Sequence, residues 1–141
     1  MEYHIHKTFK IASLSGQFLI KLDTWFDRHN LTKRDAADMV FLLQNVYVAY
    51  ALTRTELPPE IDVDASQFDV VVAGAEWMAS DLKQMLTAEH RFFYANLLHE
   101  EVSKGEESAL LNDLLDVSSA KYYDLFRHAL LRISEILKHS L

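Results

Sequence analysis

The chain has 141 residues, with 14 basic and 21 acidic side chains, no cysteine, three glycines and two prolines. This length predicts a single domain over residues 1–141 with a substantial core. The lack of cysteine excludes disulfides, thiolate metal sites and a cysteine nucleophile, and so few glycines and prolines argue against an all-β sandwich. A net charge of −7 argues against binding to duplex DNA, because such proteins usually present a basic face to the phosphates.

The sequence shows no clear targeting or membrane segment. Residues 1–10 lack the uninterrupted apolar core of a signal peptide. The most apolar stretch, at 39–52, is shorter than the roughly 20 residues needed to span a bilayer. We therefore expect a cytoplasmic protein without membrane contact.

The first predicted helix lies within residues 5–29. Apolar residues recur there at helical spacing, with polar residues between them: Ile11, Leu14, Phe18, Leu22 and Trp25. The beginning of this segment also fits the alternating pattern of a strand. A short N-terminal strand paired with residues 68–73 is therefore a minor alternative.

A second helix is predicted from Thr32 to about Thr53. Thr32 and Asp35 resemble a capping box in which aspartate replaces glutamate, and Leu31 is placed to pack against Ala36. The helix is apolar on nearly every face. Such a helix is typical of the centre of a bundle or of a subunit interface.

An acidic loop is predicted at about 54–65, because Pro58 and Pro59 prevent helix formation there. Helical spacing then continues over 68–102, with a break expected near Gly74 or near Thr87. Gly105 marks a helix end, and a short helix at 106–115 and a last helix from Tyr122 follow. The predicted fold is all-α, a single irregular bundle of five to six helices.

The histidines do not have the spacing of helix-borne metal sites. No acidic residue precedes a histidine by three positions, and no two histidines are four positions apart. We therefore expect no metal and no cofactor. The leading hypothesis, described below, includes no catalytic residue.

Two alternatives involve the predicted helix around His90. One is an RNA-cleaving helical enzyme of the HEPN type, completed across a dimer by His90, Arg91 and His99. Seven residues separate Arg91 from His99, whereas that type has four to six, so its pattern is not met. The other is a ligand or haem sensor with His90 in an apolar pocket among Phe92, Phe93 and Tyr94.

The negative charge is concentrated in the middle of the chain. Residues 57–116 hold three basic and thirteen acidic side chains, a net −10, whereas residues 1–56 carry +1 and residues 117–141 carry +2. A segregated acidic field attracts basic partners and accelerates their encounter. The alternative is that these acids only keep an apolar protein soluble.

The chain also has more large aromatic side chains than a small bundle is expected to bury. The set comprises Trp25, Phe26, Trp77, Phe92, Phe93, Tyr94, Tyr122 and Tyr123. Aromatic side chains left on a surface are typical of interface hot spots. A homodimer formed through the second or the last helix would cover some of them.

The leading hypothesis is a non-enzymatic acidic protein that binds another protein with a basic surface, as an adaptor, escort, regulator or immunity-type inhibitor. Its acidic surface would steer the partner, and exposed aromatics would secure it. The candidate contact residues are Glu60, Asp62, Asp64, Trp77, Glu100, Glu101, Glu106 and Glu107.

Overall fold

The computed structural model describes residues 13–54 and 56–139. Within these ranges it contains helices and no strands, which confirms the predicted all-α bundle. The elements are α2 (Leu14–Arg28), α3 (Arg34–Thr53), α4 (Val70–Met85), α5 (Ala88–Ser103), the 3-10 turn η1 (Gly105–Glu107), α6 (Ala109–Asp116), the 3-10 turn η2 (Ala120–Tyr122) and α7 (Tyr123–Lys138).

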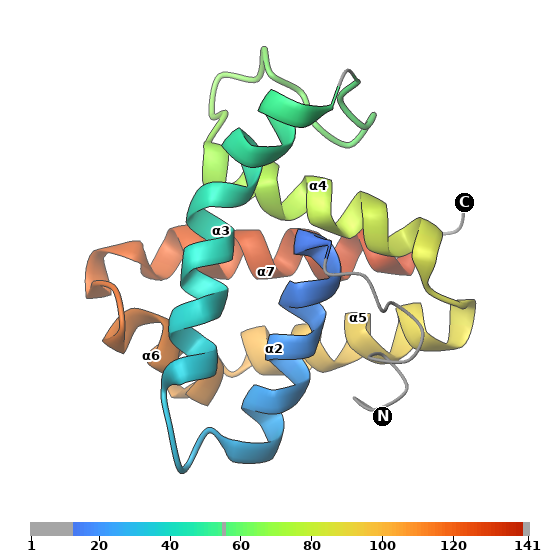
Figure 1. The fold of residues 1–141 in the computed structure, drawn as a ribbon. Coiled ribbons are helices and arrows are strands. Elements are labelled where there is room, and N and C mark those ends of the chain that lie inside the picture. The colour runs from blue at the N-terminus through green and yellow to red at the C-terminus, as the bar shows by residue number, and fades with distance from the viewer. Residues whose placement is uncertain (1–12, 55, 140–141) are drawn as a thin grey trace.

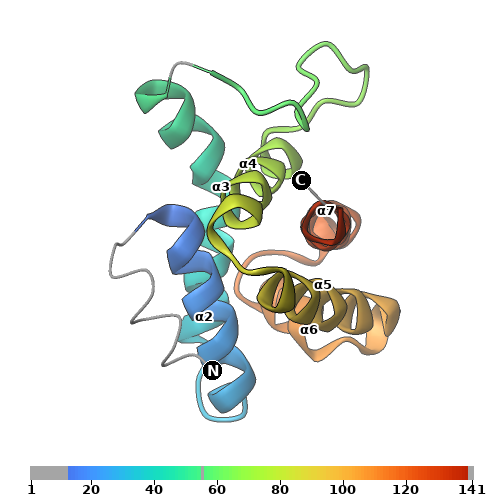
Figure 2. The same cartoon turned by 90° about the vertical axis from the view of Figure 1, so that its right-hand side faces the viewer.

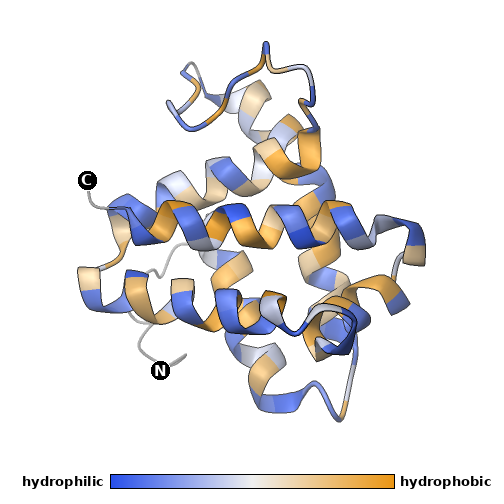
Figure 3. Ribbon diagram, turned by 180° about the vertical axis from the view of Figure 1, so that it is seen from behind, coloured by the Kyte–Doolittle hydropathy of each residue, from blue (hydrophilic) through white to orange (hydrophobic). Residues whose placement is uncertain are grey.

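The helices form two layers (Figures 1 and 2). One layer consists of α4, α7 and α5, with α7 between the other two, and the hairpin of α2 and α3 crosses it. From behind, α7 shows hydrophilic and hydrophobic residues alternating along its length, as an amphipathic helix does (Figure 3). The apolar sides of both layers meet in one continuous core.

Side-chain caps explain where several helices begin. Ser13, Asp69, Thr87 and Ser108 each accept a hydrogen bond from a backbone N–H in the first turn of α2, α4, α5 and α6, respectively. The Thr87 cap confirms the break expected near that residue, whereas α4 continues through Gly74, the other expected position. Gly105, at φ 61°, adopts the left-handed conformation that ends α5, as predicted.

The predicted capping box at the start of α3 is wrong. Thr32 Oγ1 does accept a hydrogen bond from the backbone N–H of Arg34, at 3.1 Å. Asp35, however, is fully buried and binds the Arg28 guanidinium through both of its oxygens, at 2.8 and 2.9 Å. Leu31 does not pack on the helix, because 85% of it is exposed.

The strand alternative is also wrong, because residues 70–73 belong to α4. Its N-terminal partner strand, and the predicted beginning of the first helix, lie outside the described residues. The helix predicted at 106–115 is shorter than expected, since η1 takes 105–107 and Ser108 caps α6. The predicted acidic loop extends to residue 69.

Helices α3 and α4 approach each other closely at Gly74. A Cβ atom at this position would lie 2.6 Å from Val46 Cγ1 and 3.1 Å from the backbone nitrogen of Tyr47. Only glycine fits this crossing without displacing α3. The contact brings the inner face of α3 onto the helix that begins after the acidic loop.

A buried polar network joins α2, α3 and α4. The Tyr50 hydroxyl accepts from the Ser15 N–H at 3.1 Å and lies 2.7 Å from Ser15 Oγ, which donates to Asp81 at 2.9 Å. Arg54 donates to the same carboxylate at 2.8 Å and stacks over the Tyr50 ring. Burial raises the pKa of Tyr50, so its hydroxyl remains a neutral donor and acceptor.

Helix α3 is the one helix in the described part of the chain that is long and apolar enough to cross a membrane. Length and composition do not distinguish a membrane span from the core helix of a soluble protein. The inner face of α3 is buried in the bundle: Ala36, Met39, Leu43, Val46 and Tyr50 are among its core residues.

Candidate binding surfaces

Most of the acidic side chains in residues 57–116 are used inside the fold. Seven of the thirteen pair with a basic residue or cap a helix: Glu60, Asp69, Glu76, Asp81, Glu101, Asp113 and Asp116. The other six are exposed and form no ion pair with a described residue: Asp62, Asp64, Glu89, Glu100, Glu106 and Glu107. The acidic surface is therefore smaller than the net charge of the segment suggests.

Glu101 is an interior residue, so its assignment to a contact surface is wrong. One of its oxygens accepts from Ser108 Oγ at 3.1 Å and from the Leu110 N–H at 3.2 Å, and the other binds Lys104 at 3.0 Å. Burial alone would raise the pKa of Glu101. The hydrogen bonds from Lys104, Leu110 and Ser108 outweigh that effect and hold the pKa below its ordinary value.

We expect Glu101→Gln to lower the free energy of unfolding by about 1–3 kcal/mol, because an amide cannot serve all three donors. The neighbouring Glu100→Gln is the matched control and should change stability by less than about 0.5 kcal/mol. Since the folded state lowers the pKa of Glu101, its stabilisation is present above about pH 4 and is lost as the pH falls further. Urea unfolding of both variants at pH 7 and pH 3 measures these changes in the free energy of unfolding. Equal losses for Glu101→Gln and Glu100→Gln at pH 7 would contradict the prediction.

Trp77 was also expected on the surface, and this is wrong. It is 3% exposed and packs edge-on against Tyr47 and Tyr50 in the core. Trp25 and Tyr94 are likewise buried. Of the eight aromatic residues singled out from the sequence, only Phe92 and Phe93 are classed as exposed, at 46% and 43%.

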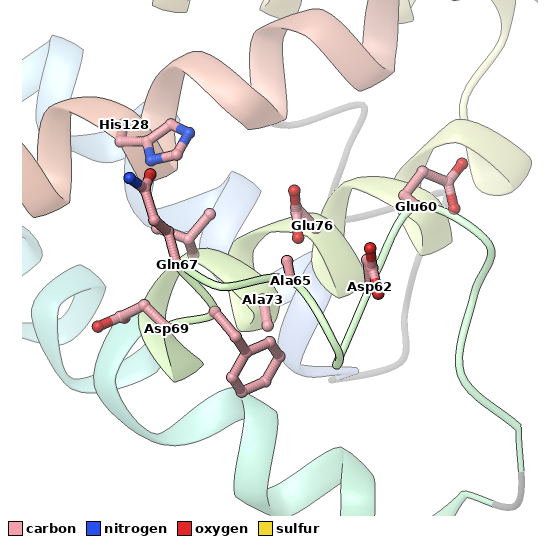
Figure 4. A pocket seen from close by; sticks show the side chains of 10 residues that line it. Glu60, Asp62, Ala65, Gln67, Asp69, Ala73, Glu76 and His128 are labelled. Atoms are coloured by element: carbon pink, nitrogen blue, oxygen red, sulfur yellow. The ribbon is translucent and has the colours of Figure 1, made fainter.

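Four carboxylates surround a pocket of about 200 Å³ between the acidic loop, α4 and α7 (Figure 4). They are Glu60, Asp62, Asp69 and Glu76. In Figure 4, Gln67 and His128 lie at one end of the pocket and Glu60 lies at the other.

Each of these carboxylates has at least one partner in the fold, although Glu60 Oε1 is buried without a hydrogen-bond partner among the described residues. Glu60 binds Lys83 at 2.9 Å and Glu76 binds Arg132 at 2.7 Å. Asp69 caps α4, and Asp62 accepts the backbone N–H of Asp64 at 3.0 Å. The pocket therefore gathers negative charge without a set of carboxylates directed at a ligand. In the described residues, no group of three or more metal-ligating side chains is placed to hold an ion.

The three residues of the enzyme alternative do not come together within one chain. Helix α5 runs unbroken past all of them, so His90 and His99 lie on opposite sides, about 14 Å apart along the axis. Arg91 is buried and donates to the backbone carbonyl of His139 at 2.9 Å. Its guanidinium thereby holds the end of α7 against α5.

The aromatic residues after His90 do not line one pocket. Phe92 and Phe93 are exposed, whereas Tyr94 is fully buried and donates to the Asp23 carboxylate at 2.8–2.9 Å. Successive positions of a helix point about 100° apart, which separates these rings. The apolar ligand site that the sequence suggested is not formed by this segment.

The exposed side of α5 combines aromatic and acidic residues. We define the α5 face as the exposed residues that lie within about 120° of one another around the helix: Glu89, Phe92, Phe93, Asn96, His99, Glu100 and Ser103. The exposed Glu106 and Glu107 of η1 follow directly beyond the end of the helix. Of the predicted contact residues, Glu100, Glu106 and Glu107 therefore lie at this surface or next to it, whereas Asp62 and Asp64 lie in the loop at the other end of the bundle (Figure 1).

A second exposed surface lies on α3, the helix that the sequence placed either at the centre of a bundle or at a subunit interface. We define the α3 face as Phe41, Asn45, Val48 and Leu52, whose apolar members are 65%, 54% and 81% exposed. The sequence showed that α3 is apolar all round. It could not show which of its sides the other helices leave uncovered.

No protein-family model matches this chain, and no curated protein or solved structure matches it. Fold and surface together define a small all-α protein with two exposed helix faces, one aromatic and acidic and one apolar.

Proposed function

We propose that this protein works by binding a partner protein through the α5 face, in an adaptor, escort, regulator or inhibitor role. The observation that carries the proposal is the pair of exposed phenylalanines, Phe92 and Phe93, on a helix side that also carries Glu89 and Glu100. Aromatic side chains on a surface supply most of their binding energy when a partner covers them.

The charge around the α5 face favours a basic partner. The last turn of α5 contains no basic residue, and Lys104 beyond it is paired with the buried Glu101. The end of a helix already carries partial negative charge, and acidic residues there are unfavourable by about 0.3–1 kcal/mol each. Glu100, Glu106 and Glu107 thus add to a negative potential that lysine and arginine of a partner would neutralise.

The partner is expected to have an apolar pocket for the two phenylalanine rings, with lysine or arginine around it. The rings would make the short-range contacts that slow dissociation, and the carboxylates would raise the association rate. The affinity should therefore fall with rising salt, because exposed charge pairs are screened.

Comparative affinity purification from the native cell tests this proposal. One variant, Phe92→Ser with Phe93→Ser, removes the rings, and a second replaces the four carboxylates at Glu89, Glu100, Glu106 and Glu107 by amides. The matched control makes the same kinds of change at the other end of the bundle: Asp62→Asn, Val63→Ser and Asp64→Asn.

The expected result is a protein that the wild type and the control enrich and that both α5 variants lose by at least about tenfold, the effect of about 1.4 kcal/mol. Purified, that protein should bind more weakly at high salt. Retention of every enriched protein by both α5 variants would refute the proposal, and so would loss only in the control. Circular dichroism checks that all variants remain folded.

A further inference from the structure

The outer side of α3 lacks the charges that a solvent-facing helix normally carries. From Met39 to Thr53 the helix contains no charged residue. The two acidic residues in its first turns both form ion pairs, Asp35 with Arg28 and Asp38 with Lys21. A surface helix usually places charged and polar residues on the side away from the core.

The exposed apolar residues of α3 form one line along the helix. Phe41, Val48 and Leu52 follow one another at intervals of seven and four, so they lie within about 40° around the axis. Asn45 lies at the edge of the same line, and its side-chain Nδ2 donates a hydrogen bond to the Phe41 carbonyl at 2.8 Å. Its donor is thus partly satisfied by its own helix, which lowers the cost of covering it.

Charges of opposite sign flank the two ends of α3. Arg34 lies on the same side of the helix as Phe41 and forms no ion pair with any described residue. Glu56, just beyond the other end of α3, is also exposed and forms no ion pair in the described ranges. The α3 face is therefore apolar in the middle and positive at its beginning, and the carboxylate of Glu56 follows beyond the end of the helix, next to Ala51 and Arg54.

The geometry points to a second copy of this chain as the occupant of the α3 face, with the two α3 helices antiparallel about a two-fold axis. A two-fold interface must complement itself. In the antiparallel arrangement, Phe41 of each copy lies against Leu52 of the other, and Asn45 lies against Val48. Arg34 then reaches the end of the other copy's helix, from which Glu56 follows.

A parallel pair lacks this complementarity, because it places Arg34 against Arg34 and aligns the two helix dipoles unfavourably. The antiparallel pair opposes the dipoles and joins unlike charges. Leu31, in the turn before α3, is also highly exposed. This inference concerns a different face from the α5 face, so either proposal can fail without the other.

Oligomeric state is the first test. Sedimentation velocity and light scattering of the whole chain, from low micromolar to submillimolar concentration, should show a monomer–dimer equilibrium. Phe41→Glu with Leu52→Glu should raise the dimer dissociation constant by about 100-fold or more, because dimerisation would then bury four glutamate side chains, two from each copy. Phe92→Glu with Phe93→Glu is the matched control and should leave the dissociation constant unchanged.

Helix direction is the second test, and it does not depend on a destabilising substitution. Arg34→Glu and Glu56→Arg should each weaken the dimer, and the two together should restore it, because each new pair again has unlike charges. The chain contains no cysteine, so single cysteines can be introduced cleanly. A mixture of Phe41→Cys and Leu52→Cys chains should be joined by a short bismaleimide, whereas Phe41→Cys alone should not, because its two copies lie about 16 Å apart along the axis.

Several results would overturn the inference. A monomer at all concentrations would do so. Binding of the monomer to phosphatidylcholine vesicles that depends on Phe41 and Leu52 would assign the face to a membrane surface. A dimer that survives Phe41→Glu with Leu52→Glu would place the interface elsewhere, and ready cross-linking of Phe41→Cys chains to themselves would show a parallel pair.

Discussion

Replacing Arg28 with methionine is expected to lower the free energy of unfolding by about 2–4 kcal/mol. Arg28 is the bidentate partner of Asp35, whose side chain is completely buried at the start of α3. Methionine keeps much of the aliphatic volume but leaves the carboxylate without its guanidinium. The cost falls at or below that of a fully buried pair, because the arginine itself is half exposed and screened by water.

The stabilisation by the Arg28–Asp35 pair should decrease as the pH falls. The hydrogen bonds from Arg28 hold the pKa of Asp35 below its ordinary value, although burial opposes them. The pair therefore stabilises the fold fully above about pH 4, and that stabilisation is lost as the pH falls through the folded-state pKa. Urea unfolding from pH 7 to pH 2 should show the gap between wild type and Arg28→Met closing at the acid end.

Replacing both members of the pair is the control. Arg28→Met combined with Asp35→Leu removes the charge together with its partner, so it should recover a large part of the loss at pH 7. A double variant as unstable as Arg28→Met alone would show that lost packing, and not the unpaired carboxylate, causes the destabilisation.

Trp25→Ala is expected to cost about 3–5 kcal/mol in the free energy of unfolding. The indole is almost fully buried in the core and packs against Phe26 and His29. Its Nε1 donates to the Asp113 carboxylate of α6 at 2.8 Å, and Lys33 binds the other oxygen at 2.6 Å. The substitution therefore empties part of the core and removes the link between α2 and α6.

Trp25→Phe separates these two contributions. Phenylalanine retains most of the apolar contact but has no N–H, so the expected cost is about 1–3 kcal/mol. Chemical denaturation followed by far-ultraviolet circular dichroism measures both variants without relying on the lost tryptophan fluorescence. If Trp25→Phe were as unstable as Trp25→Ala, the hydrogen bond to Asp113 would account for the whole effect and the packing argument would be wrong.

The positions of the helices followed from local signals. The repeat of apolar residues predicted α3, α4, α5 and α7, Gly105 marked one break of the central region, and Thr87 was one of two positions expected for the other. These signals act within a few residues of each other, so the sequence contains them directly. The capping box at Thr32 was wrong because Asp35 has a stronger partner, Arg28, which a local pattern cannot weigh.

The candidate surfaces were harder to predict, because burial depends on residues far apart in the chain. Glu100 and Glu101 are neighbours, yet one is exposed and the other is bound by Ser108 and Leu110 across the next turn. Trp77 and Phe92 are both aromatic residues in predicted helices, and only the packing of α3 onto α4 hides the first.

By itself, the sequence determined that this protein is helical, where most of its helices lie, and that its middle segment is acidic. The reason is that helix formation and capping depend on residues three or four positions apart. Only the tertiary structure decided which charged side chains are paired within the protein and which sides of the helices remain exposed. Ion pairs such as Glu76 with Arg132, and the close crossing at Gly74, join residues that no local pattern connects. The α5 face and the α3 face are what those long-range contacts leave uncovered.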